Sequence, residues 1–277
     1  MSYDYTISSS KQGVMTPCLS RTMPSPKLQN QYIHRINKVI DYIQDNMSSE
    51  LKLDILAQIS GFSPYHFHRI FSALVGETLN NFIKRVRNEK AAMLLIGEPN
   101  LPITRIAFQC GFSSSQAFAR SFNERFNLSP SEYRNQKHPN QKSKIRNIQS
   151  KNRQAIQIGL DYDEENDRPI INYKSNQELN MKVEIKELED IPIAYVRHIG
   201  PYKGDTQLFE DLFNKLMSWA GPRNLLDKET KMFCMYHDNP NLTDEDKQRG
   251  DVCMSIPEDT EVEGEVGKSV IKAGKYA

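Results

Sequence analysis

The sequence is poor in cysteine, and its four cysteines are scattered. Cys18, Cys110, Cys234 and Cys253 form no C-x-x-C pair, and none has a histidine at the spacing of metal ligands. This pattern argues against a disulfide framework and against a zinc site, and it favours a reduced, cytoplasmic setting. We expect neither a metal nor a cofactor.

Long apolar runs are also missing. No stretch approaches the roughly 18 apolar residues that cross a bilayer, so no membrane partner is expected. Residues 1–30 are polar and rich in Ser and Thr, without the apolar core of a signal peptide, and are expected to form a disordered arm. The sequence lacks a Gly-rich phosphate loop and any spacing that would assemble a nucleophile, a base and an orienting residue, so an enzyme is not expected.

Acidic residues are scarce in the first half of the chain and basic residues are outnumbered in the second, which the net charge conceals. The net charge is +1, but residues 31–160 carry 18 Lys and Arg against 9 Asp and Glu, a charge of +9. Residues 161–277 carry 15 against 25, a charge of −10. Such asymmetry suggests a nucleic-acid-binding half joined to a half of another kind, although merely solvated charged faces would give the same count.

A repeat organises the basic half. Residues 53–71 read LDILAQISGFSPYHFHRIF, and residues 103–122 read ITRIAFQCGFSSSQAFARSF. The copies share a GFS tripeptide, and further matches pair Ala57 with Ala107, Arg69 with Arg120, and Phe71 with Phe122. Fixed-distance repetition marks a supersecondary unit, here helix, tight turn, helix.

The local chemistry of the first copy supports this interpretation. Gly61 stands where the first helix must stop and the chain reverse, which favours a residue that tolerates positive φ. Ser63 suits the N-cap and Pro64 the first position of the next helix. In the second copy, Ser113 or Ser114 is the expected N-cap.

The second helix of each repeat copy is predicted to have an apolar face and a polar face. Phe67, Phe71, Phe118 and Phe122 recur at helical spacing and are expected in the core rather than stacked on bases. His66 and His68 point in different directions along their helix, which argues against metal binding.

The faces opposite the phenylalanines carry polar groups that suit the major groove of DNA: Tyr65, His68, Arg69, Ser115, Gln116, Ala119 and Arg120. Residues 79–96 read as one helix between the units, roughly 27 Å long.

The paired modules and the closing NLSPSEYR at residues 127–134 resemble the DNA-binding domain of the AraC/XylS family of bacterial transcription regulators. The resemblance implies an all-α domain over residues 31–135 with two helix-turn-helix units, a regulator (activator) that reads double-stranded DNA in two adjacent major-groove segments, and RNA polymerase as a further partner. It places base contacts on the seven outward residues given above. The expected phosphate contacts are Lys84, Arg85, Arg87, Lys90, Arg105 and Arg125, with solvated surface charge as the alternative for any one of them.

Residues 136–180 are expected to be a linker of low hydrophobicity, in which IINY at 170–173 is a short strand or a docking segment. From residue 181 the pattern alternates with period two at 183–188, 191–200, 231–239 and 251–257, and a helical stripe covers 205–220. The acidic half is therefore predicted to be α+β, strand-helix-strand-strand.

AYVRHIGPYKG at 194–204, the helix that contains Trp219, and EGEVGKSVIKAGKYA at 263–277 resemble the GyrI-like effector-binding domain. Residues 181–277 would hold one complete half of that two-half domain and one further strand, a truncated form. The resemblance implies a small-molecule effector, cationic and amphipathic in related proteins. The candidate ligand-binding residues are Tyr195, His198, Tyr202, Trp219, Met235 and Tyr236, with ordinary core as the alternative, above all for Trp219. Two other roles remain open for this domain, a protein-sequestering module and a ligand hydrolase.

Overall fold

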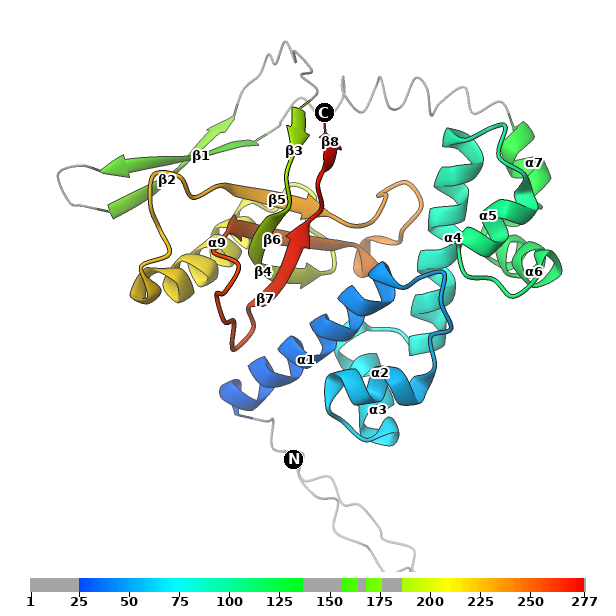
Figure 1. Cartoon of the computed structure of the whole chain (residues 1–277), viewed down its shortest axis with the longest axis horizontal. Coiled ribbons are helices and arrows are strands. Elements are labelled where there is room, and N and C mark those ends of the chain that lie inside the picture. Colours follow the sequence, from blue (N-terminus) through cyan, green and yellow to red (C-terminus); the bar gives the residue numbers. More distant parts are fainter. Residues whose placement is uncertain (1–24, 137–155, 164–167, 176–185, 277) are drawn as a thin grey trace, which may run out of the picture.

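The computed structural model describes residues 25–136, 156–163, 168–175 and 186–276 (Figure 1). A helical N-terminal domain is followed by a C-terminal domain of antiparallel sheet and helix, as the sequence predicts. None of the helices in these ranges combines the length and the hydrophobicity that a bilayer crossing requires. The helices of the first domain are α1 (Pro26–Asp45), α2 (Leu53–Ser60), α3 (Pro64–Val75), α4 (Leu79–Gly97), α5 (Ile103–Gln109), α6 (Ser115–Phe126) and α7 (Pro130–Asn135).

Helix α1 begins earlier than the sequence predicts. Ser25 is its N-cap and accepts a hydrogen bond from the Leu28 amide, and Pro26 occupies the first helical turn. Residues 25–30 therefore belong to a capped helix and not to a disordered arm, and the rest of that predicted arm lies outside the described residues. A capping serine followed by proline is a helix-start signal that the polar composition of the segment obscures.

The two predicted helix-turn-helix units are α2–α3 and α5–α6. Gly61 (φ 67°) and Gly111 (φ 80°) both adopt the left-handed conformation at their turns. Ser114 is the N-cap of α6 and accepts from the Ala117 amide. Ser63 occupies the N-cap position of α3, but its hydroxyl lies 3.2 Å from His66 Nδ1 and does not cap the helix.

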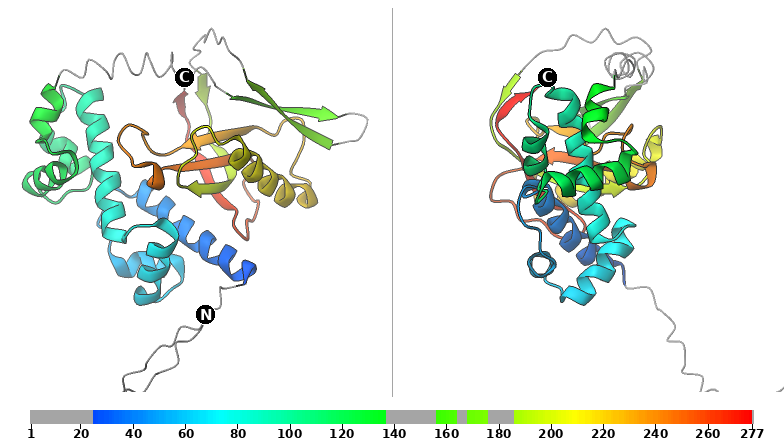
Figure 2. Two further views of the ribbon diagram at one scale, coloured as in Figure 1. Left: turned by 180° about the vertical axis from the view of Figure 1, so that it is seen from behind. Right: turned by 90° about the vertical axis from the view of Figure 1, so that its right-hand side faces the viewer.

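Helix α4 belongs to the cores of both units. Phe82, near its start, packs with Phe71 and with the apolar stripe of α1, while Leu95, near its end, packs with Phe118 and Phe122. The helix has 19 residues without a break, a length of about 28 Å. The two units therefore lie at opposite ends of one rod, as Figures 1 and 2 show.

Part of the predicted linker is structured. Strands β1 (Ile156–Asp163) and β2 (Arg168–Ser175) form an antiparallel pair in which Ile156 stands opposite Ser175. IINY thus lies in a strand, the first of its two expected alternatives, whereas β1 lies in a part of the linker for which no strand was predicted. The remainder of residues 136–180, apart from Gln136, lies outside the described residues.

The C-terminal domain contains the predicted strand-helix-strand-strand order in β4 (Ile191–Ile199), α9 (Thr206–Ala220), β5 (Met232–Tyr236) and β6 (Arg249–Ser255). Strand β7 (Gly267–Ile271) joins them in an antiparallel sheet of order β5-β6-β4-β7. The short strands β3 (Lys186–Leu188) and β8 (Gly274–Tyr276) pair separately. Single 3-10 turns, η1 (Gly221–Arg223) and η2 (Glu245–Lys247), follow α9 and precede β6.

The alternation along β4 assigns its residues to two faces. Ala194 and Val196 are buried against α9, together with Leu216. Ile193 and Tyr195 lie on the opposite face, which is turned toward α1 (Figure 1). One face of the sheet therefore forms the core of the C-terminal domain with α9, and the other face contacts the DNA-binding domain.

Candidate nucleic-acid interface and effector site

The polar face of α3 is open to solvent. Tyr65 is 68% exposed, and His68 and Arg69 are exposed as well. The guanidinium carbon of Arg69 lies 5.6 Å from the centroid of the Tyr65 ring, a cation–π contact that holds the two side chains together. Phe67 and Phe71 on the other face are fully buried, which confirms the predicted division of this helix.

The polar face of α6 is similar. Gln116 and Arg120 are exposed, while Ser115 and Ala119 are half-buried. Within the described ranges, neither Arg69 nor Arg120 forms an ion pair with another residue. Both guanidinium groups are therefore free to meet an external acceptor.

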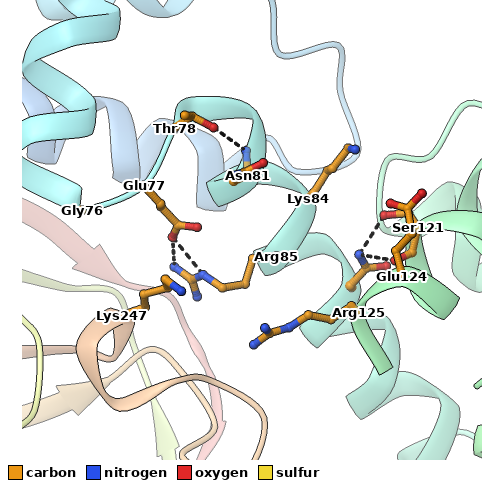
Figure 3. Close-up of a pocket in the computed structure, with 11 residues that line it drawn as sticks. Gly76, Glu77, Thr78, Asn81, Lys84, Arg85, Ser121, Glu124, Arg125 and Lys247 are labelled. Carbon is orange, nitrogen blue, oxygen red and sulfur yellow. Dashed lines mark hydrogen bonds and ion pairs between the residues drawn. The ribbon is translucent and has the colours of Figure 1, made fainter. Parts of the chain in front are cut away.

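A polar cleft of about 520 Å³ lies between α4 and α6. Figure 3 shows Thr78, Asn81 and Lys84 on the α4 side and Glu124 on the α6 side. Asn88 closes its back by donating from Nδ2 to the Ser121 hydroxyl at 2.8 Å. Lys84 is exposed here, in keeping with its expected contact to phosphate.

Arg85 and Arg87 are predicted phosphate contacts that require correction. The Arg85 side chain is only 5% exposed and donates to Glu77 at 2.7 Å and to Glu89 at 3.2 Å. Arg87 donates to the carbonyl oxygens of Met47 and Ser49, each at 3.0 Å. Their guanidinium groups are occupied within the protein, which removes both from the candidate phosphate contacts. A run of basic residues does not reveal which of them turn inward.

The C-terminal domain meets α4 and α6 through the segment between β5 and β6. Asp238 forms a buried pair with Arg249 at 2.6 Å and lies 3.6 Å from Arg85 of α4. Asp244 pairs with Arg125 of α6 at 3.4 Å, and the Leu242 side chain packs on the core of the second unit. We call this set the α4 contact.

The C-terminal domain also meets α1. Asp41 of α1 accepts a hydrogen bond from the Tyr195 hydroxyl and pairs with Arg197 Nη1 at 2.9 Å. Gln44 Nε2 donates to His237 Nδ1 at 3.1 Å, which leaves the ring proton on Nε2 to be donated to Asp251 at 2.7 Å. We call this set the α1 contact. The two contacts attach the C-terminal domain to α1, which packs on the first helix-turn-helix unit, and to α4 and α6.

The buried carboxylate of Asp251 makes stability depend on pH. Burial alone would raise its pKa, but attraction to Arg197 and hydrogen bonds from His237 and Arg197 outweigh burial and lower the pKa from 3.8 to about 2. As the pH falls, Asp251 is protonated in the unfolded chain before it is protonated in the folded one. The ionised carboxylate therefore stabilises the folded chain fully above about pH 4, and this stabilisation is lost as the pH falls toward about 2. Roughly 2 kcal/mol of the free energy of unfolding is at stake.

Urea unfolding measured at about pH 5 and about pH 3 checks this expectation. Asp251→Asn is the control, because it keeps the size of the side chain and removes its titration. The variant should lose less stability than the wild-type chain between the two pH values. Equal losses would contradict the assignment to Asp251.

The predicted ligand-binding residues do not converge on one cavity. Tyr195 is buried and engaged with Asp41, and His198 Nε2 lies 3.1 Å from the Pro201 carbonyl oxygen. Trp219 is 8% exposed and packs in the core between α9 and the sheet, which agrees with the alternative that it is an ordinary core residue. Sequence spacing gives the strand and the helix but not the direction in which each ring points.

Two of these residues do lie together. Tyr202 and Tyr236 have ring centroids 5.2 Å apart, and Phe209, which the sequence did not single out, lies 6.3 Å from each. Tyr236 is 56% exposed, so this aromatic cluster is open at the surface. Met235 lies on the other face of the sheet with Phe233 and Ile193.

Two recognition helices fixed by one rod and attached to a small α+β domain define a double helix-turn-helix DNA-binding protein with an accessory domain. Residues 56–136 match the family model described as a helix-turn-helix domain, and residues 181–277 match the GyrI-like small molecule binding domain.

Part of the chain is similar in sequence to known proteins. The multiple antibiotic resistance protein MarA of Salmonella typhimurium is 34% identical over 99 residues, covering 36% of this chain and 77% of MarA. The transcriptional activator AarP of Providencia stuartii is 37% identical over 99 residues, covering 36% of this chain and 73% of AarP. Among solved structures, the C-terminal domain of AraT from Geobacillus stearothermophilus is 30% identical, with a TM-score of 0.35 and coverage of 36% and 83%. The chain belongs to the AraC family of DNA-binding transcription regulators and carries a GyrI-like domain in addition.

Proposed function

We propose that this regulator reads DNA with α3 and α6 in two adjacent major-groove segments on the same side of the duplex. The observation that carries the proposal is the exposure of both polar faces, with Arg69 and Arg120 at matching positions and no internal acceptor for either among the described residues. Arg is suited to bidentate contact with guanine, and Gln116 to contact with adenine. Tyr65, His68, Ser115 and Ala119 complete the proposed reading surface, and Lys84 contacts phosphate.

We further propose that a small molecule bound to the C-terminal domain modulates DNA binding. The support is the pair of contacts that join this domain to α1 and to α4 and α6, since a change in the domain then acts on these three helices together. A ligand shifts such an arrangement only if it binds one state more tightly than the other. The aromatic cluster of Tyr202, Phe209 and Tyr236 is one surface that a ligand could use.

Membership of the AraC family also suggests a location, a protein partner and a mode of action. We expect the protein to act in the cytoplasm as an activator, to contact RNA polymerase, and to have no catalytic activity of its own, so that turnover of an ester probe would contradict this view. The proposed functional units are residues 31–135 for DNA and 181–277 for the effector.

Arg69→Ala and Arg120→Ala should each weaken binding to the preferred DNA by about 1–3 kcal/mol, because each loses a bidentate contact to a base. The preferred DNA is obtained by selecting bound duplexes from random sequences. Affinities are then compared on the selected duplex and on random DNA at one salt concentration. A loss of the same size on both would show that the arginine contacts phosphate and reads no base.

A further inference from the structure

A groove separates the N-terminal half of α1 from the C-terminal domain. Its volume is about 670 Å³, and its walls come from α1 on one side and from α9 and the loop between β6 and β7 on the other. Figure 1 shows this loop reaching down beside the N-terminal half of α1. We call it the α1–α9 groove; its lining includes Lys27, His34, Arg35, Lys215, Trp219 and Val266. The aromatic cluster of Tyr202, Phe209 and Tyr236 is not part of it.

Trp219 is one of the lining residues, and its buried indole carries an unpaired hydrogen-bond donor. The side chain is 8% exposed, and its indole Nε1–H is buried without an acceptor among the described residues. A buried donor left without a partner costs about 1–3 kcal/mol, and such groups are rare in native proteins. A rearrangement of this wall that gives the indole an acceptor would remove this cost.

The charges around the groove favour an anion. Four cationic side chains line it, Lys27, Arg35, Lys215 and Arg223, against two acidic ones, Glu263 and Glu265. Both acids are already paired, Glu265 with Lys215 at 2.9 Å and Glu263 with Arg223. The excess positive charge therefore belongs to Lys27 and Arg35, on the α1 wall.

The opposite wall is partly apolar. Val262, Val266 and the ring of Trp219 line it, and the guanidinium carbon of Arg223 lies 5.0 Å from the centroid of the indole. A binding groove that combines apolar walls with a few placed polar groups suits a small organic molecule. An anionic head near α1 and an apolar body near Trp219 would satisfy both walls.

We propose that the α1–α9 groove binds a small amphipathic carboxylate, with the carboxylate toward Lys27 and Arg35 and the apolar body against Trp219 and Val266. The proposal rests on the effector control proposed above and gives it a site and a ligand charge. The charge is opposite to the cationic ligand that the sequence resemblance implies. The site also differs from the aromatic cluster, because part of its lining belongs to α1 of the N-terminal domain.

The position of Arg35 connects the groove to DNA reading. Arg35 Nη1 donates to the Gly61 carbonyl oxygen at 3.3 Å, and its guanidinium carbon lies 5.0 Å from the centroid of the Phe62 ring. Gly61 and Phe62 form the turn that precedes recognition helix α3. A carboxylate that draws Arg35 into the groove weakens its hold on this turn, so occupancy and the placement of α3 are linked.

Trp219 is the only tryptophan of the chain, so its fluorescence reports directly on the groove. The full chain is titrated with phenylbutyrate and, separately, with phenylbutylamine, which has the same apolar body and the opposite charge. We expect a saturable change in Trp219 fluorescence with the carboxylate and none with the amine. Equal binding of the amine, or no binding of the carboxylate, would overturn the proposal.

Two variants test the position of the site. Lys27→Gln alters an exposed side chain and should weaken phenylbutyrate binding about fivefold, the effect expected from one solvent-exposed charge. Trp219→Phe, followed by calorimetry, should also weaken it about fivefold, because the smaller ring gives the apolar body less contact area. Lys228→Gln, which removes an exposed lysine outside the groove, is the matched control and should bind as the wild-type chain does. Unchanged affinity in both groove variants would refute the site.

DNA binding by the wild-type chain, measured with and without ligand, tests the groove proposal and the DNA-reading proposal independently. Binding of the wild-type chain to its selected duplex is measured without ligand and with saturating phenylbutyrate. Absence of specific binding in both conditions would contradict the DNA-reading proposal, whatever the groove binds. Specific binding that saturating carboxylate leaves unchanged would contradict the effector role of the groove.

Discussion

Gly111→Ala should destabilise the protein by more than about 3 kcal/mol, the range that overpacking and backbone strain reach together. Gly111 has φ of 80°, where a side chain is strained. A Cβ atom there would also overlap the Met47 carbonyl oxygen and lie 2.7 Å from Arg87 Nη2. The Met47 oxygen is itself the acceptor for Arg87, so the substitution disturbs the junction between the two helix-turn-helix units.

Gly76→Ala is the control that isolates the steric part of this effect. Gly76 has nearly the same φ, 78°, but a Cβ there meets nothing within 4 Å. We expect it to cost only the backbone strain, about 1–2 kcal/mol. Free energies of unfolding in urea give both values, and DNA affinity gives a second measure. Equal costs would mean that the turn of the second unit can move away from Met47.

Arg85→Met should cost about 3–5 kcal/mol, because it leaves buried acids without their cation. The Arg85 guanidinium lies among Glu77, Glu89 and Asp238, whose side chains are at most 8% exposed. Asp238 belongs to the C-terminal domain, so the loss should also weaken the α4 contact. Unfolding in urea, followed separately by the fluorescence of Trp219 and by helical circular dichroism, measures both effects.

Lys84→Ala is the neighbouring control with the opposite expectation. Lys84 is exposed, so stability should hardly change, whereas the slope of log affinity against log salt should fall by about 1 as one phosphate contact is lost. Arg85→Met should leave that slope unchanged. If instead Arg85→Met lowers the slope and spares stability, the buried assignment of Arg85 is wrong.

Much of the fold could be predicted because the signals are local. The GFS turns, the helix between them and the period-two pattern after residue 181 fix the helices and strands where the structure has them. The first residues of α1 were missed because composition outweighed a capping serine followed by proline. Strand β1 was missed because its acidic end resembles solvated chain, although it pairs with β2 along its whole length.

The direction of a candidate site residue could be predicted only where the periodicity of a single helix sets it. The outward faces of α3 and α6 follow from helical spacing, so Arg69, Gln116 and Arg120 lie where expected. The directions of Arg85 and Arg87 depend on residues far away in sequence, such as Asp238 and Met47. The same is true of Tyr195, whose hydroxyl meets Asp41 of another domain. No local pattern contains that information.

The length of α4 has a consequence for the DNA itself. At about 28 Å, the rod is shorter than the roughly 34 Å that separates equivalent points on successive turns of a straight duplex. If the length of the rod sets the separation of the two recognition helices, both can enter their grooves fully only when the duplex curves toward the protein. Base steps that kink easily would be favoured between the two contacted segments, so part of the operator's identity would reside in flexibility at positions that no side chain touches.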